Sequence, residues 1–312
     1  MKTPKIPRVL AELLSIRRPH GGVGEKLAQN IVMREIMGLG HKIVKDTHGN
    51  IEVQVGDPAG CVFTAHLDTV HREDGEQVLF IISETGEIVA DTLDGKASVL
   101  GADDASGVYL LLEMIAANRP GMYLFFVGEE CGGIGSSAYV KDHKTFSANM
   151  VVSFDRRGTK DIITHQGGYC TASNTFAMAL GDEMNRLNPT FEYAPCAGGL
   201  YTDSREFAEI VPECTNIAVG YYNEHTIRES QDLIHLLALR DVVVSLDFQS
   251  LPISRVPEPD LPWAWDDKDI PSFSTRKEAL EAISSLREAG IAGDLSDVEL
   301  NHYLDIIEGY VR

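Results

Sequence analysis

Carboxylates and imidazoles follow short apolar runs at several places in the sequence. The clusters are His66-Leu67-Asp68 after CVFTA, Asp103-Asp104 after Gly101-Ala102, Glu129-Glu130 after MYLFFV, Asp155 after MVVSF, and Glu224-His225 after a segment ending at Val219. None of them offers a convincing serine or cysteine nucleophile. Divalent cations such as zinc accept this mixture of ligands. Because two histidines and three or four carboxylates are too many for one tetrahedral site, the set predicts two metal ions that share a bridging carboxylate, an arrangement suited to hydrolysis.

Each cluster alone also has a simpler interpretation. His66 and Asp68 could form a surface pair, Glu129 and Glu130 could belong to a solvated loop, and Asp103 could cap a helix N-terminus. A chance origin would have to place all of these groups at strand ends. Taken together, they favour a site.

The segments around the clusters alternate between helix and strand patterns. Met122–Val127 and Met150–Phe154 are continuous apolar runs, typical of strands buried on both faces. Ala105–Ala117 has apolar residues at three- and four-residue steps, which predicts a helix. Other elements are expected at Cys61–Ala65, Gln77–Asp91 (a hairpin), Thr171–Leu180 (a helix), Thr215–Val219 and Ser230–Leu246 (a helix). The order predicts an α/β sheet covered on both faces, with a site at the carboxyl ends of its strands.

Composition restricts the partners and the location. The 312 residues contain 27 Lys+Arg and 47 Asp+Glu, a formal net charge of −20, and 44% of them are hydrophobic. A globular protein of this charge is repelled by phosphate, so we expect neither nucleic acid nor a membrane as a partner. The sequence has no apolar run of signal-peptide or transmembrane length, and its five cysteines lack CxxC spacing. We therefore expect a cytoplasmic protein with reduced thiols.

The composition changes after Leu251. Residues 252–271 hold five of the 13 prolines and both tryptophans, and two capping boxes begin at Thr275 and Ser296. We expect a catalytic domain at 1–251, a linker at 252–274 and a helical C-terminal extension at 275–312. The extension is interpreted as a solvated appendage on the main domain, with an oligomerisation or partner-docking arm as the alternative.

The motifs HLDT, GADDASG, GEE and SFD, together with the late His225, resemble the signatures of the di-zinc exopeptidase superfamily. That group includes the leucyl aminopeptidase, peptidase T and carboxypeptidase G types and related deacylases. Asp46-x-x-Gly49-Asn50 and the segment from Gly198 to Ser204 are similar to theirs as well. The resemblance covers roughly residues 10–250. It implies a three-layer α/β sandwich with a mixed, mostly parallel central sheet.

The resemblance also implies a role for each residue. The metal ligands are His66 and Asp155 for one ion, Glu130 and His225 for the other, and Asp103 as the bridge. Asp68 would accept the second N–H of His66 and fix its tautomer. Glu129 would be the general base that takes a proton from a metal-bridging water. A cis peptide bond is implied between Asp103 and Asp104.

The sequence departs from the family pattern in one respect. Only 70 residues separate Asp155 from His225 (225 − 155), and predicted elements use most of them. We therefore expect a catalytic core without a lid domain. Groups that a lid would supply must come from elsewhere. The candidates are Tyr193, Tyr201 and His165 for an oxyanion, and Arg156, Arg157 and Arg205 for a substrate carboxylate.

These features predict a metal-dependent amide hydrolase that acts on a small peptide, most simply an aminopeptidase or dipeptidase. An N-acyl amino-acid deacylase with the same site is the alternative. A catalytically silent scaffold is disfavoured because every ligand position and the base position are filled. Two divalent ions are expected, zinc first, with cobalt or manganese as alternatives. The sequence is compatible with a homo-oligomer.

Overall fold

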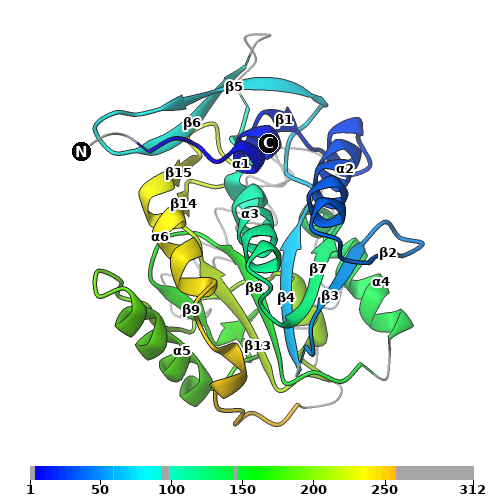
Figure 1. Ribbon diagram of the computed structural model, residues 1–312, viewed down its shortest axis with the longest axis vertical. Coiled ribbons are helices and arrows are strands. Elements are labelled where there is room, and N and C mark those ends of the chain that lie inside the picture. Colours follow the sequence, from blue (N-terminus) through cyan, green and yellow to red (C-terminus); the bar gives the residue numbers. More distant parts are fainter. Residues whose placement is uncertain (1–3, 59, 93–97, 144–145, 258–312) are drawn as a thin grey trace, which may run out of the picture.

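An eight-stranded sheet forms the centre of the computed structural model, which describes residues 4–58, 60–92, 98–143 and 146–257 (Figure 1). In spatial order its strands are β12 (Ala194–Cys196), β9 (Asp161–Ile163), β13 (Glu213–Ala218), β8 (Met150–Arg156), β4 (Cys61–His66), β7 (Gly121–Phe126), β3 (Ile51–Val55) and β2 (Ile43–Lys45). The four strands from β13 to β7 are parallel to one another, whereas β3 is antiparallel to β7, β2 to β3, and β9 to β13. The predicted mixed, mostly parallel sheet is confirmed.

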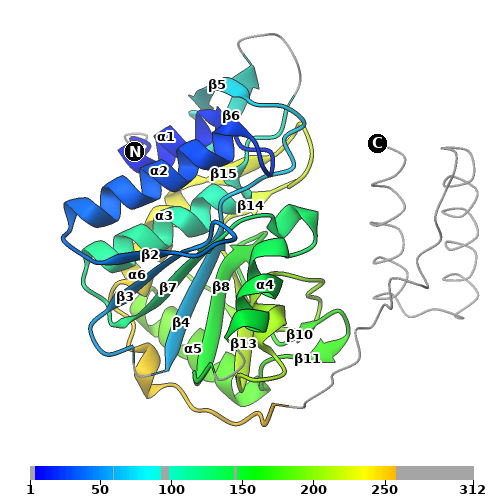
Figure 2. The same ribbon diagram turned by 90° about the vertical axis from the view of Figure 1, so that its right-hand side faces the viewer.

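Helices cover both faces of this sheet. The helices on one face are α2 (Val23–Gly38), α3 (Ala102–Ala116), α5 (Asn174–Leu187) and α6 (Leu233–Val243), and α1 (Arg8–Leu14) packs against α2 and α3. The other face packs against α4 (Ile134–Asp142) and the short helix η2 (Asp203–Phe207). Figure 2 shows the sheet between α3 and α4. Every residue of β4 is buried, as expected for a strand with both faces covered. The predicted three-layer sandwich is thus confirmed.

A second sheet has five strands. Its order is β1 (Ile16–Arg17), β5 (Gly75–Ile81), β6 (Glu87–Thr92), β15 (Ser230–Asp232) and β14 (Tyr221–Tyr222). The expected hairpin corresponds to β5 and β6. The expected helix from Ser230 was wrong at its start, because Ser230–Asp232 pairs with β6 instead. Helix α6 begins at Leu233, where the Asp232 carboxylate accepts the His235 N–H at 2.9 Å and caps the helix.

The chain between Asp155 and His225 is filled by small elements of the core. Besides β9, α5, β12, η2 and β13, it contains the two-stranded ribbon of β10 (His165–Gln166) and β11 (Tyr169–Cys170). This agrees with the predicted core without a lid. The elements not yet named are the short helices η1 (Glu129–Cys131) and η3 (Phe248–Ser250).

Residues 258–312, which include most of the predicted linker and the whole predicted extension, lie outside the described residues, so these domain boundaries stay predictions. All five cysteines are free. None of the described helices combines the length and apolar character needed to cross a membrane.

Candidate metal centre

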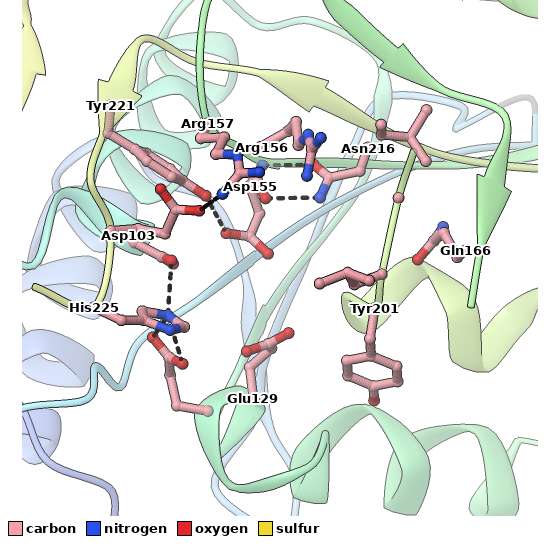
Figure 3. A pocket seen from close by; sticks show the side chains of 15 residues that line it. Asp103, Glu129, Asp155, Arg156, Arg157, Gln166, Tyr201, Asn216, Tyr221 and His225 are labelled. Carbon is pink, nitrogen blue, oxygen red and sulfur yellow. Dashed lines mark hydrogen bonds and ion pairs between the residues drawn. The ribbon is translucent and has the colours of Figure 1, made fainter. Parts of the chain in front are cut away.

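Four neighbouring parallel strands end at the same edge of the sheet, and the predicted site residues gather there. His66 ends β4, Asp155 lies near the end of β8, and η1 follows β7 directly. The loop after β14 brings His225 to the same place, opposite Asp103 at the start of α3 (Figure 3). Strand direction explains the convergence, because parallel strands bring their carboxyl ends to one edge.

Asp103 lies between the two predicted histidine ligands. Its Oδ1 is 2.9 Å from Nε2 of His66, and its Oδ2 is 3.2 Å from Nε2 of His225. One oxygen of the carboxylate therefore faces each imidazole, the arrangement that a bridging ligand requires. The expected cis peptide bond between Asp103 and Asp104 is present.

Each histidine also has a carboxylate of its own. The Oδ1 atom of Asp155 is 3.5 Å from Nε2 of His66, and Oε2 of Glu130 is 3.0 Å from Nε2 of His225. The pairs are those expected for the two halves of the site. The donor atoms of His66, Asp103 and Glu130 also all lie within 4.8 Å of one another. Nitrogen and oxygen donors grouped so closely fit divalent metal ions such as zinc.

Two other groups of potential ligands each contain acids that already accept hydrogen bonds from the protein. Asp104 lies near His66 and Asp155, but its oxygens accept the backbone N–H groups of His66 at 3.1 Å and Gly107 at 2.8 Å. Gly107 is needed there, since a Cβ atom at this position would lie 2.4 Å from the carbonyl oxygen of Phe154. Asp104 thus anchors α3 to the central strands.

The second group consists of His20, Glu25 and Asp68. Glu25 accepts the Gly21 N–H at 2.8 Å and contacts Nδ1 of His20 at 3.1 Å. Both oxygens of Asp68 also accept hydrogen bonds, from the turn described below. These groups hold loops together, so the donors around Asp103 are the better set for metal.

The electrostatics of the centre reflect the packing of several acids in one buried place. Burial and the neighbouring Asp103 raise the pKa of Glu130 to about 7, and the same two causes raise the pKa of Asp155. Burial opposes a charged imidazole at His225, but Glu130 and Asp103 outweigh it and raise its pKa to about 12. The centre therefore favours positive charge strongly, as a site for divalent cations should.

The adjacent acids Glu129 and Glu130 lie in different environments. Both oxygens of Glu130 are within 3.1 Å of Nε2 of His225. The Glu129 carboxylate is 3.9 Å from Nε2 of His66, and within the described part of the chain no hydrogen bond to it is found. Burial raises the pKa of Glu129 well above its ordinary value. Glu130 is placed like a ligand. Glu129 lines a hollow beside the centre, whose wall also includes Asp155, Tyr201 and His225, and its oxygens are available there.

Asp68 contacts the turn of Glu129 more closely than it contacts the imidazole. Its oxygens accept the N–H groups of Glu129 at 3.0 Å and Glu130 at 3.2 Å. Its Oδ1 is 3.6 Å from Nδ1 of His66, while its backbone carbonyl oxygen is nearer, at 3.2 Å. Besides any effect on His66, Asp68 positions both glutamates.

The motif Asp46-x-x-Gly49-Asn50 holds the same turn from the other side. The Asn50 side chain accepts the Val127 N–H at 3.2 Å and donates to the Gly135 carbonyl at 3.0 Å. It thereby joins the two ends of the loop that carries Glu129.

Two buried residues that support the centre were not recognised in the sequence. Arg18 donates to the carbonyl oxygens of Leu67 at 3.0 Å and Gly101 at 2.9 Å, next to two of the metal-centre segments, and also to that of Leu13. Glu229 accepts the N–H groups of Gly101 and Asp103. Both lie in irregular segments where no periodicity marks them, although the Arg17-Arg18 pair was a visible basic signal.

The candidates for an oxyanion are placed less favourably. Tyr201 lines the hollow, but its hydroxyl donates to Glu206 at 2.9 Å. Tyr193 donates to the Ala218 carbonyl, and Nδ1 of His165 is 2.9 Å from the hydroxyl of Thr164. Tyr221, which was not predicted, lines the hollow and donates to Asp155 at 3.1 Å.

The candidate arginines are divided between the hollow and the interior. Arg156 and Arg157 line the hollow, where they contact Asp161 at 3.2 Å and Glu224 at 2.9 Å. Arg205 is buried and lies over the ring of Tyr169, 5.8 Å from its centre.

Comparisons with known proteins identify a family and several solved structures that this chain resembles. The family model for peptidase family M28 matches residues 48–210. Among solved structures, a tripeptidase from Staphylococcus aureus matches with a TM-score of 0.64 and 14% identity over 76% of this chain and 95% of that one. Aminopeptidase PepT from Bacillus cereus matches with a TM-score of 0.58 and 16% identity over 77% and 96% of the two chains.

The TET1 peptidase from Pyrococcus horikoshii gives a TM-score of 0.51 and 15% identity over 78% and 96%. At identities this low, the structural matches show a shared fold and no more. No match was found among curated protein sequences.

Proposed function

This chain belongs to peptidase family M28, and on that premise we propose that it is an aminopeptidase or dipeptidase that hydrolyses small peptides with two bound divalent metal ions. His66 and Asp155 would hold one ion, and Glu130 and His225 would hold the other. Asp103 would be a ligand to both ions. The ions, zinc in the first place with cobalt or manganese as alternatives, supply polarisation of the scissile carbonyl and a lowered pKa for the attacking water.

The contrast between Glu129 and Glu130 carries the proposal. A general base needs a carboxylate that lies beside the reacting atoms without being a ligand. The position of Glu129, which lines the hollow 3.9 Å from Nε2 of His66, supports this role. Glu129 takes a proton from the attacking water and delivers it to the leaving amine. Burial of this carboxylate raises its pKa and so makes it a stronger base.

A deacylase remains the second candidate because Arg156 and Arg157 line the same hollow and could receive the carboxylate of an N-acyl amino acid. Both arginines already contact acids, Asp161 and Glu224, and this favours the peptidase. The S. aureus and B. cereus structures of the same fold are a tripeptidase and an aminopeptidase.

The test is turnover by the 312-residue chain, first stripped with a chelator and then loaded with zinc, cobalt or manganese. The panel contains aminoacyl nitroanilides, dipeptides and N-acyl amino acids. We expect metal-dependent cleavage of the first two classes. Cleavage of N-acyl amino acids alone would identify a deacylase, and metal binding without cleavage of any substrate would identify a scaffold.

We also propose a cytoplasmic protein and, for its assembly, a homo-oligomer. The five free cysteines support the first proposal. A protein of similar fold, the P. horikoshii TET1 peptidase, can assemble into a tetrahedron or a large octahedral shell, which supports the second. Light scattering on the full chain tests the assembly.

A further inference from the structure

Gln166 provides an unused hydrogen-bond acceptor in the wall of the hollow. Its side chain is 1% exposed, and its Oε1 atom has no hydrogen-bond partner among the described residues. Figure 3 shows Gln166 across the hollow from Asp103 and His225, with its oxygen on the side of Tyr201 and Glu129. A buried carbonyl without a donor is costly, so such an atom calls for a donor from outside the protein.

The orientation of this amide is determined by its neighbours. Nε2 of Gln166 lies 3.1 Å from the Ser204 hydroxyl and 3.4 Å from the Cys214 carbonyl oxygen. The Ser204 hydroxyl donates its own proton to the Thr215 carbonyl at 3.1 Å, so its oxygen accepts from Gln166. The Cys214 carbonyl can only accept. Both neighbours therefore require the NH₂ group on their side, and the oxygen is left toward the hollow.

The other groups around the hollow restrict what can approach this oxygen. The hollow has a volume of about 130 Å³, and Ile163 and Leu200 form apolar parts of its wall. The amide of Asn216 is occupied, since it accepts the Asp155 N–H at 2.9 Å and donates to the Asp155 carbonyl at 2.7 Å. Arg156 disfavours a cationic side chain, and an ionised carboxylate has no proton to donate to the Gln166 oxygen.

We propose that Gln166 determines substrate specificity by accepting a hydrogen bond from a neutral donor group, a hydroxyl or amide N–H, at the end of a small substrate side chain. The preferred residues beside the scissile bond are therefore of the serine, threonine and asparagine class. This inference rests on the proposed peptidase function and adds the class of side chain that the hollow selects.

Threonine and valine provide the test, because they have nearly the same shape and differ by one hydroxyl donor. We compare kcat/KM for Thr-Ala with Val-Ala, and for Ala-Thr with Ala-Val, using the metal-loaded wild-type protein. An acceptor left unpaired by valine should give a preference for threonine of about tenfold or more in one of the two pairs. Equal rates in both pairs would overturn the inference while leaving the peptidase intact. Cleavage of none of the four dipeptides would count against the proposed function itself.

Variants then assign the preference to Gln166. Gln166→Met removes the acceptor, and the Thr/Val ratio should fall to about one. Thr171→Val, which removes a neighbour 3.3 Å from the same Nε2 but leaves Oε1, is the matched control and should keep the ratio. If Gln166→Met is inactive, binding of free threonine and valine by calorimetry gives the same ratio. A ratio that survives in Gln166→Met would overturn the inference.

Discussion

The Asp68 carboxylate accepts the backbone N–H of Glu129 at 3.0 Å and so ties the end of β4 to the turn that carries the proposed base. The second Asp68 oxygen holds the next residue, the proposed ligand Glu130. One buried side chain thus sets the position of the base and of a ligand together. A metal-dependent hydrolase needs its base and its ligands held in fixed relative positions, because displacement of the base by about 1 Å can lower the rate about a hundredfold.

Asp68→Asn should lower kcat by about 10- to 100-fold with metal content near that of the wild type. An asparagine has one acceptor oxygen, so its NH₂ group would face one of the two backbone N–H groups. Steady-state kinetics and metal analysis measure the effect. Asp74→Asn is the matched control, since Asp74 also accepts two backbone N–H groups, those of Val23 and Gly24, but does not line the site. An unchanged kcat in Asp68→Asn would contradict the positioning role.

Glu129→Gln should reduce kcat by about 10²- to 10⁴-fold, because the amide cannot accept the proton. Its metal content should stay near the wild-type value, since Glu129 is the acid without a ligand-like contact. Glu130→Gln should instead lose metal. Elemental analysis of the two purified variants separates the roles, and loss of metal in Glu129→Gln would mean that the two glutamates are exchanged.

His225→Ala should lose both metal and activity. We expect its affinity for zinc to fall by more than the roughly 10- to 100-fold that loss of a ligand's hydrogen-bond partner costs. Competition with a chromogenic chelator measures this affinity. If the variant keeps metal and activity, the last ligand is another histidine. His165 and His235 are the candidates to examine next, although the structure pairs them with Thr164 and Tyr193.

The central strands and the convergence of the acidic clusters could be predicted from sequence because both follow from simple patterns. Buried parallel strands leave continuous apolar runs, and parallel strands must end at one edge. The roles within the pair Glu129-Glu130 came from the family resemblance, since two neighbouring glutamates look alike in sequence. Their separation depends on how η1 turns after β7, which no local pattern records.

The residues that the sequence did not reveal act through long-range backbone contacts. Arg18 lies 49 residues from Leu67 and 83 from Gly101, the carbonyls that it joins. Gln166 belongs to a two-residue strand, too short for any periodicity. The apolar pattern predicts a helix from Ser230, but Ser230 pairs with β14 and Gln231 with β6, and this tertiary pairing overrides local preference.

Arg18→Met should destabilise the protein by about 3 kcal/mol, because it removes a donor from each of three carbonyl oxygens and leaves the buried acids without their cation. Arg18→Lys keeps the charge but not the planar fork, so it should recover only part of the loss. Chemical denaturation of the two variants gives the comparison. Arg34→Lys, at an exposed arginine paired with Glu12 and Glu35, is the control and should change stability by less than about 1 kcal/mol. Equal stability of Arg18→Met and wild type would contradict this account.

His235 should make the protein less stable as the pH falls below about 6.5. Burial lowers its pKa to about 4 in the folded state, whereas the ordinary value of 6.5 applies after unfolding. Between these values the unfolded chain binds a proton that the folded protein does not, so the free energy of unfolding decreases with decreasing pH. At 1.36 kcal/mol per unit, the full difference corresponds to at most about 3 kcal/mol.

His235→Gln tests this assignment. The Tyr193 hydroxyl donates to the Ala218 carbonyl, so its oxygen accepts the N–H at Nε2 of His235 at 2.8 Å, a donor that glutamine can replace without titrating. Urea denaturation at several pH values between 4 and 7 should show a weaker dependence on pH in the variant than in the wild type. Since His235 contacts the aromatic rings of Phe191 and Tyr193 rather than the metal centre, activity at neutral pH should be retained. Parallel curves for the two proteins would show that another group titrates in this range.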